Sequence, residues 1–134
     1  MKGEMILYKN ENELNLLPLR DLTSTEINLF FSMCNKLKEK DTEELTIPFN
    51  ELNHLSSYEQ AEKKKLINDL KRISDKVTRL TYTQYRGLSF EKFVLFTSYE
   101  VNAEDEYLTI SVNYKVKDIL NELTGDFTKL SWKN

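Results

Sequence analysis

The chain has 134 residues, a length that suits one domain of ordinary size and is too short for two. Its composition, 40% hydrophobic and 31% charged with three glycines and two prolines, excludes a disordered or loop-dominated chain. A single cysteine excludes an internal disulfide and a multi-cysteine zinc site, and no apolar run reaches the length of a membrane span. We therefore expect a cytoplasmic protein that uses no cofactor, metal or membrane.

The net charge of −3 speaks against a nucleic-acid binder, but the charges are unevenly distributed. Residues 1–56 carry a net charge of −4, residues 57–92 carry +4, and residues 93–134 carry −3. Because salt screens charges over roughly 8–10 Å, a local patch can matter more than the total. The middle third of the chain is a basic island in an acidic protein.

The first elements expected are a strand over residues 5–8, a polar stretch over residues 9–15 and a long helix. Thr23 and Glu26 fit a capping box, in which a hydroxyl and a carboxylate each accept an amide hydrogen bond at the start of a helix. The helix is expected over about residues 24–39. Its buried face is predicted from the helical spacing of apolar residues, which are Ile27, Phe30, Phe31, Cys34 and Leu37.

Two short elements come next. Residues 45–47 predict a minimal strand that stops at Pro48, and residues 49–55 predict a two-turn helix.

The strongest pattern is an amphipathic helix over residues 57–79, capped by Ser57 with Gln60 three residues later. Its apolar residues share one stripe, made of Leu66, Leu70, Ile73, Val77 and Leu80. The opposite face carries one amide and a row of cations, namely Lys64, Lys65, Asn68, Lys71, Arg72, Lys76 and Arg79. Asp75 is the only acid among them. One face can pack on a core while the other presents positive charge.

Strand-like stretches follow this helix. Residues 80–86 and 89–101 flank a tight turn that begins after Arg86, and the second stretch is apolar on both faces near its middle, so we expect it to be central or covered. Residues 107–113 alternate, and the side chains expected to point inward are those of Leu108, Ile110 and Val112. A last helix is expected over residues 114–123, with Gly125 as its C-cap.

Helix, strand, helix, helix, strand, turn and strand is the order of a winged-helix domain, and this chain adds strands around it. The expected fold class is α+β: a winged helix with a small antiparallel sheet and additional strands. We expect residues 1–134 to form a single domain of this kind.

Four segments carry a resemblance to a known family. They are Asn15-Leu16-Leu17-Pro18-Leu19-Arg20 leading into the helix of residues 23–38, Lys92-Phe93-Val94-Leu95-Phe96-Thr97, Leu108-Thr109-Ile110-Ser111-Val112-Asn113, and Ile119-Leu120-Asn121-Glu122-Leu123-Thr124-Gly125-Asp126-Phe127-Thr128. In these core and turn patterns the chain resembles the N-terminal winged-helix domain of plasmid replication initiator (Rep) proteins, which bind repeated iteron sequences. The resemblance extends from about residue 6 to residue 130.

The resemblance implies two tandem winged helices, of which the second reads the iteron bases. The first contributes phosphate contacts and, in the repressor form, the dimer interface. This sequence stops where the second domain would begin, so it is either the first domain of a longer initiator or a naturally short version. The partners implied are double-stranded DNA of an origin or operator, a second copy of the chain, and host replication proteins.

We interpret the basic face as a DNA-binding site made of Lys64, Lys65, Asn68, Lys71, Arg72, Lys76, Arg79 and Arg86. Each cation that neutralises a phosphate releases a counterion, which gives salt-sensitive affinity without sequence preference. Few side chains on this helix suit base edges, namely Asn68, Arg72 and Arg79, so the pattern indicates phosphate contact and not base reading. The alternative interpretation is that a lysine-rich helix face is simply solvated surface.

The strands of residues 89–101 and 107–113 are a candidate dimer surface, because an exposed edge can pair with a symmetric copy of itself or two sheets can stack. The alternative is that these apolar residues only build the core of the monomer.

The sequence gives little support for an enzymatic function. One histidine, His54, cannot supply the histidine pair that rolling-circle initiators use to hold a metal, and the three glycines are too scattered for a phosphate-binding loop. Residues 104–106 are consecutive acids that mark a solvated turn, and Cys34 is expected to be an inert buried thiol. Two other functions remain open: an interaction module that does not bind DNA, and a small transcription regulator that binds one operator.

Overall fold

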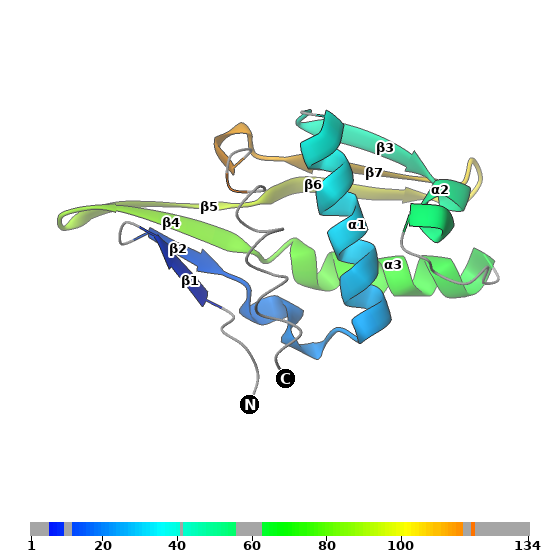
Figure 1. Ribbon diagram of the computed structural model, residues 1–134, viewed down its shortest axis with the longest axis horizontal. Coiled ribbons are helices and arrows are strands. Elements are labelled where there is room, and N and C mark those ends of the chain that lie inside the picture. Colours follow the sequence, from blue (N-terminus) through cyan, green and yellow to red (C-terminus); the bar gives the residue numbers. More distant parts are fainter. Residues whose placement is uncertain (1–5, 10–11, 41, 56–62, 117–118, 120–134) are drawn as a thin grey trace.

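Two antiparallel sheets and the helices that cover them share one hydrophobic core in the computed structural model of the chain (Figure 1). The structure describes residues 6–9, 12–40, 42–55, 63–116 and 119. The elements α1 (Ser24–Lys40), β3 (Glu44–Pro48), α2 (Phe49–Leu55) and α3 (Lys63–Val77) follow in the predicted order. The α+β winged-helix arrangement is thereby confirmed, although its sheets differ from those expected.

The capping box at the start of α1 is confirmed. The Thr23 amide donates to Glu26 Oε1 at 2.8 Å, and the Glu26 amide donates to Thr23 Oγ1 at 3.1 Å. The predicted buried face is only partly right, because Ile27 and Phe31 are half-buried. The helix buries six side chains, those of Glu26, Leu29, Phe30, Met33, Cys34 and Leu37.

The apolar stripe of α3 is confirmed, since its stripe residues within the helix are all buried, as is Leu80 just beyond it. The predicted end at Arg79 is wrong, because the helix ends at Val77. The amides of Arg79 and Leu80 donate to carbonyls three residues back, at 3.1 and 3.2 Å, which tightens the chain into a turn before the next strand. The predicted cap of Ser57 and Gln60 lies outside the described residues.

The first sheet has the order β1-β2-β4-β5, made of β1 (Ile6–Lys9), β2 (Asn12–Asn15), β4 (Thr81–Arg86) and β5 (Ser89–Val94). β2 falls in the stretch expected to be merely polar, which is a correction. It is a four-residue strand with one buried side chain, Leu14, so it carries almost no apolar periodicity. Pairing with β1 on one side and β4 on the other fixes it in the sheet.

The second sheet has the order β3-β7-β6, with β6 (Phe96–Asn102) and β7 (Tyr107–Val112). The single strand expected over residues 89–101 is wrong, because the chain breaks at Leu95 and passes from one sheet to the other. The Leu95 amide donates to the carbonyl of Leu80, which precedes β4, and the Leu95 carbonyl accepts from the amide of Asn113, which follows β7. As a result β5 and β6 are both edge strands and are not central ones.

The predicted inward face of β7 is confirmed by the burial of Leu108, Ile110 and Val112. β7 pairs with β3 on one side and with β6 on the other. Its edges are therefore occupied, and the expectation that residues 107–113 offer an edge for a second copy is wrong.

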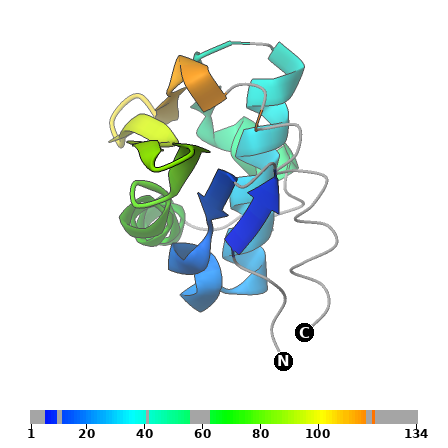
Figure 2. The ribbon, with the colours of Figure 1, turned by 90° about the vertical axis from the view of Figure 1, so that its left-hand side faces the viewer.

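The helix expected over residues 114–123 begins as a 3-10 turn, η2 (Tyr114–Val116), and Ile119 is buried. The rest of that prediction, including Gly125, lies outside the described residues. Within the core, the rings of Phe30 and Phe96 meet edge to face with centroids 5.9 Å apart, which joins α1 to the second sheet. In Figure 2, α3 and the β4–β5 ribbon lie on one side of the molecule and α1 lies on the other.

Candidate nucleic-acid interface

The outer face of α3 carries three exposed residues in one line, Lys64, Asn68 and Lys71. They recur at i, i+4 and i+7, the spacing of a single helix face, while the buried stripe holds the helix against the core. The two lysines are separated by about 10 Å along the helix axis, which is close to the rise of three phosphates along one strand of DNA.

These two lysines differ from their neighbours in their partners. The side chains of Lys64 and Lys71 make no hydrogen bond or ion pair with the residues that the structure describes. Lys65, by contrast, holds Asp69 Oδ2 at 3.2 Å one turn along the helix. Part of the predicted basic row is therefore compensated within the protein, and part presents uncompensated positive charge.

Arg72 is tied to the start of α1. Its Nε donates to Glu26 Oε2 at 2.6 Å, and its Nη2 lies 3.4 Å from Glu26 Oε1. The Glu26 side chain is only 4% exposed, whereas that of Arg72 is 54% exposed. The capping carboxylate of one helix thus fixes a guanidinium on the outer side of another.

Burial by itself would raise the pKa of Glu26. The hydrogen bond from Arg72, the bond from the Thr23 amide and the attraction of the guanidinium outweigh burial and lower the pKa below its ordinary value of 4.5. The same pairing raises the pKa of Arg72. Both groups are therefore charged at neutral pH, and Glu26 offsets the positive charge that Arg72 adds to the face.

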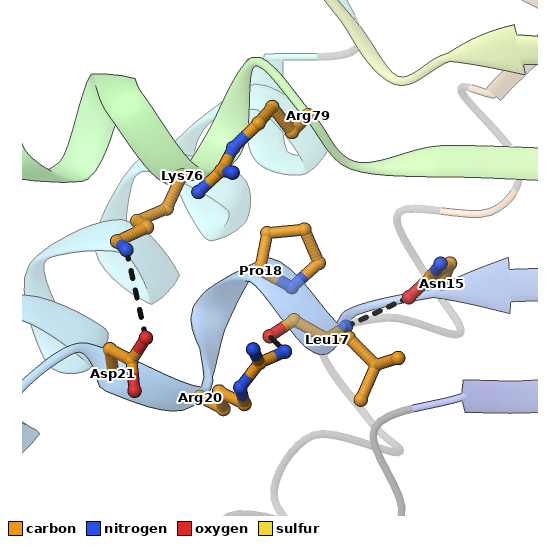
Figure 3. A pocket seen from close by; sticks show the side chains of 7 residues that line it. All are labelled: Asn15, Leu17, Pro18, Arg20, Asp21, Lys76 and Arg79. Carbon is orange, nitrogen blue, oxygen red and sulfur yellow. Dashed lines mark hydrogen bonds and ion pairs between the residues drawn. The ribbon is translucent and has the colours of Figure 1, made fainter.

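Lys76 and Arg79 lie where α3 ends against η1 (Leu17–Asp21), as Figure 3 shows. The Lys76 side chain is 21% exposed and its Nζ is 3.8 Å from Asp21 Oδ2. Arg79 is exposed in the turn, and its Nε donates to the Asp75 carbonyl at 2.9 Å. These two cations therefore face η1 and a pocket beside it.

The structure does not bring Arg86 together with the cations of α3. Arg86 ends β4, about 17–20 Å of strand beyond the helix, and Figure 1 shows the β4–β5 ribbon extending away from the body. The ribbon turn uses Gly87 at φ +62°, followed by Leu88, and both are exposed. Glycine in the first position of a two-residue turn, with a positive φ, is typical of a type II′ hairpin.

Aromatic side chains are exposed on the ribbon. Tyr85 and Phe90 face each other across the two strands, with ring centroids 6.1 Å apart, and Phe90 is 64% exposed. Val94 is also exposed on this strand. The prediction that this stretch is covered is therefore wrong within β5.

Sequence reasoning missed three features of this surface. Arg20 on η1 lies against the end of α3, although 56 residues separate it from Lys76. Lys92 is exposed on the ribbon, and Glu26 has a second role beyond capping. Only Lys92 has a signal in the sequence, because it belongs to the basic island; the other two depend on contacts between distant elements.

Potential metal ligands are dispersed in the part of the chain that the structure describes. No cluster of histidine, cysteine, aspartate or glutamate there has an arrangement that holds a metal ion. Cys34 is fully buried, and burial raises the pKa of its thiol, as expected for an inert side chain. None of the described helices is both long and apolar enough to span a membrane.

A core of helix, strand and two helices, followed by a two-stranded ribbon, defines a winged-helix domain. The sequence model of one family, described as "Initiator Replication protein, WH1", matches residues 7–134. The chain belongs to this WH1 family of replication initiator proteins, and the resemblance noted in the sequence is confirmed.

Individual relatives agree with this assignment. The chain is 25% identical over 130 residues to "Probable replication protein rep" of Bifidobacterium longum (strain NCC 2705), a match that covers 96% of this chain and 43% of that protein. The chain thus spans less than half the length of this relative. Its fold is similar to the crystal structure of the WH1 domain of MSBI1.176, a replication protein isolated from a multiple sclerosis patient, with a TM-score of 0.55, 13% identity and coverage of 80% of this chain and 86% of the other.

Proposed function

We propose that this chain is a DNA-binding domain of a plasmid replication initiator, which contacts phosphates of origin or operator DNA without catalysis. Membership of the WH1 family supports the role in replication initiation. The observation that carries the DNA contact is a pair of exposed lysines, Lys64 and Lys71, which have no carboxylate partner among the described residues. They lie on the outer face of a helix whose opposite face is buried in the core. Such a pair attracts a polyanion and gains affinity by counterion release.

The roles within the site follow from the partners just described. Lys64 and Lys71 contact phosphates directly, and Asn68 between them is the polar side chain suited to a base edge. Lys65 and Arg72 contribute less, because carboxylates already offset their charges. Arg86 contacts the same DNA only through the ribbon, at a separate place. The domain would be the first of two in the initiator and would act in the cytoplasm.

The test is a titration of labelled duplex DNA by fluorescence anisotropy between 50 and 200 mM salt. The double variant Lys64→Gln/Lys71→Gln removes two charges and should lower the salt slope of log K by about 1.8, which corresponds to about 60-fold weaker binding at 0.1 M salt. The matched control is Lys38→Gln/Lys40→Gln, which removes two exposed charges from the end of α1. Arg72 is left unchanged, because its loss would also disturb Glu26.

The outcome separates the candidate functions. Equal slopes for the two double variants would refute the α3 interface. Absence of binding at low salt, together with stable self-association in sedimentation, would indicate an interaction module that does not bind DNA. Tight binding to one operator by this chain alone, seen by footprinting, would indicate a transcription regulator.

A second candidate function, self-association, is favoured by the exposed apolar side chains of the ribbon. Tyr85, Phe90 and Val94 lie on one face of the β4–β5 pair, and solvent-exposed aromatic residues in a group are typical of protein interfaces. We propose a homodimer through this face. Phe90→Ser should lower the mass measured by sedimentation equilibrium, whereas Leu88→Ser at the tip should not; an unchanged mass for both variants would contradict this surface.

A further inference from the structure

A pocket of about 150 Å³ lies between η1 and the last turn of α3 (Figure 3). Arg20 and Asp21 approach it from η1, Lys76 approaches it from the last turn of α3, and Arg79 approaches it from the turn that follows. Pro18 closes one wall. The pocket is smaller than the roughly 300–1,000 Å³ of drug-sized ligand sites, so it suits a small charged group and not a whole nucleoside.

The charges of the pocket are unbalanced. It holds three cationic side chains and a single carboxylate, Asp21, whose side chain is 65% exposed and only 3.8 Å from Lys76. Arg20 and Arg79 make no ion pair with the described residues. Like charges in one small pocket repel each other, and an anion that enters the pocket removes that repulsion.

Both arginines are held in place by backbone carbonyls. Arg79 Nε donates to the Asp75 carbonyl at 2.9 Å, and Arg20 Nη1 lies 3.4 Å from the Leu17 carbonyl. Most of each guanidinium remains available for a ligand, and its planar set of donors matches phosphate oxygens. The attraction of a helix C-terminus for cations explains why Lys76 lies at this pocket. It does not explain the presence of Arg20, which belongs to a different element.

We propose that this pocket binds one phosphate group, with Arg20 and Arg79 as its principal donors, and that the group is a backbone phosphate of the bound DNA. The choice of DNA as the source rests on the proposed function, because the pocket lies at the C-terminal end of α3, the helix that carries Lys64 and Lys71. A free phosphate ligand offers the same chemistry, and the experiment distinguishes the two sources.

The experiment uses Arg20→Gln, with Arg20→Lys as the conservative variant and Lys38→Gln as the matched control on α1. Loss of one phosphate contact should lower the salt slope by about 0.9 and weaken duplex binding about eightfold at 0.1 M salt. Arg20→Lys should recover most of the slope, and Lys38→Gln should leave it unchanged. In parallel, inorganic phosphate is titrated into each protein and followed by amide chemical shifts.

A salt slope that is clearly lowered in Arg20→Gln, but not in Arg20→Lys or Lys38→Gln, supports a backbone phosphate of DNA as the ligand of the pocket. An unchanged slope, with saturable phosphate shifts near Leu17 and Arg79 that disappear in Arg20→Gln, supports the phosphate site but overturns DNA as its source. An unchanged slope without such shifts overturns the proposal, even where Lys64→Gln/Lys71→Gln still weakens DNA binding. If the wild-type chain binds no duplex, the proposed function fails and the phosphate titration alone decides the pocket.

Discussion

Replacing Arg72 with leucine tests how the face of α3 is tied to the core. The substitution removes the guanidinium but leaves Glu26, whose side chain is 4% exposed, with Thr23 as its hydrogen-bond partner. A hydrogen bond to a charged group contributes about 1.5–3 kcal/mol. The loss of stability has an upper limit, because Glu26 can take up a proton when the guanidinium is absent. Protonating a carboxyl of ordinary pKa at pH 7 costs about 3.4 kcal/mol. We expect the free energy of unfolding to fall by about 2–3 kcal/mol.

The pH dependence identifies the cause. In the wild-type protein the pKa of Glu26 is lowered, so its contribution to stability is present above its ordinary pKa of 4.5 and is lost as the pH falls through the folded-state pKa. In Arg72→Leu burial and the hydrogen bonds of Thr23 remain, and the pKa of Glu26 should rise above its wild-type value. The variant should then regain stability, relative to wild type, as the pH falls towards that raised pKa.

The assay is urea denaturation followed by circular dichroism at pH 7.5 and pH 5. The control is Lys71→Leu, the neighbouring exposed cation, which should change the free energy of unfolding by no more than about 0.5 kcal/mol. Glu26→Gln in the Arg72→Leu background should recover part of the loss, because the uncharged amide needs no guanidinium. A destabilisation that is equal at both pH values, or equal to that of Lys71→Leu, would refute the reasoning.

Three further predictions concern the scaffold. Gly87→Ala should cost about 1–2 kcal/mol in thermal unfolding because of the positive φ, whereas Leu88→Ala, with its exposed side chain, should cost less than about 0.5 kcal/mol. Tyr99→Phe should cost about 1 kcal/mol in urea unfolding, since it removes the bond of 2.8 Å from the phenol to the Leu70 carbonyl; no loss would mean that water replaces this bond. Cys34 should react with a thiol reagent only at the rate of unfolding, because it is fully buried, and rapid labelling of the native protein would contradict this burial.

Periodicity accounts for what could be predicted from the sequence. α3 has four buried side chains at helical spacing, and buried and half-buried side chains alternate along β7. The buried face of each element can therefore be predicted from its own residues. β2 has one buried residue and Leu95 joins two sheets within a single apolar run. Neither arrangement has a local signature, because partner strands distant in the sequence decide both.

The same distinction applies to the candidate site. The pattern on α3 treats its basic residues as equivalent, since all fall on one arc of the helix. The structure separates them by partners: Glu26 from α1 and Asp21 from η1 offset Arg72 and Lys76, while Lys64 and Lys71 meet no such carboxylate among the described residues. The attraction for a phosphate depends on the charge left after internal pairing. Substitutions at the two uncompensated lysines should therefore alter DNA binding with little effect on folding, and substitutions at Arg72 should alter both.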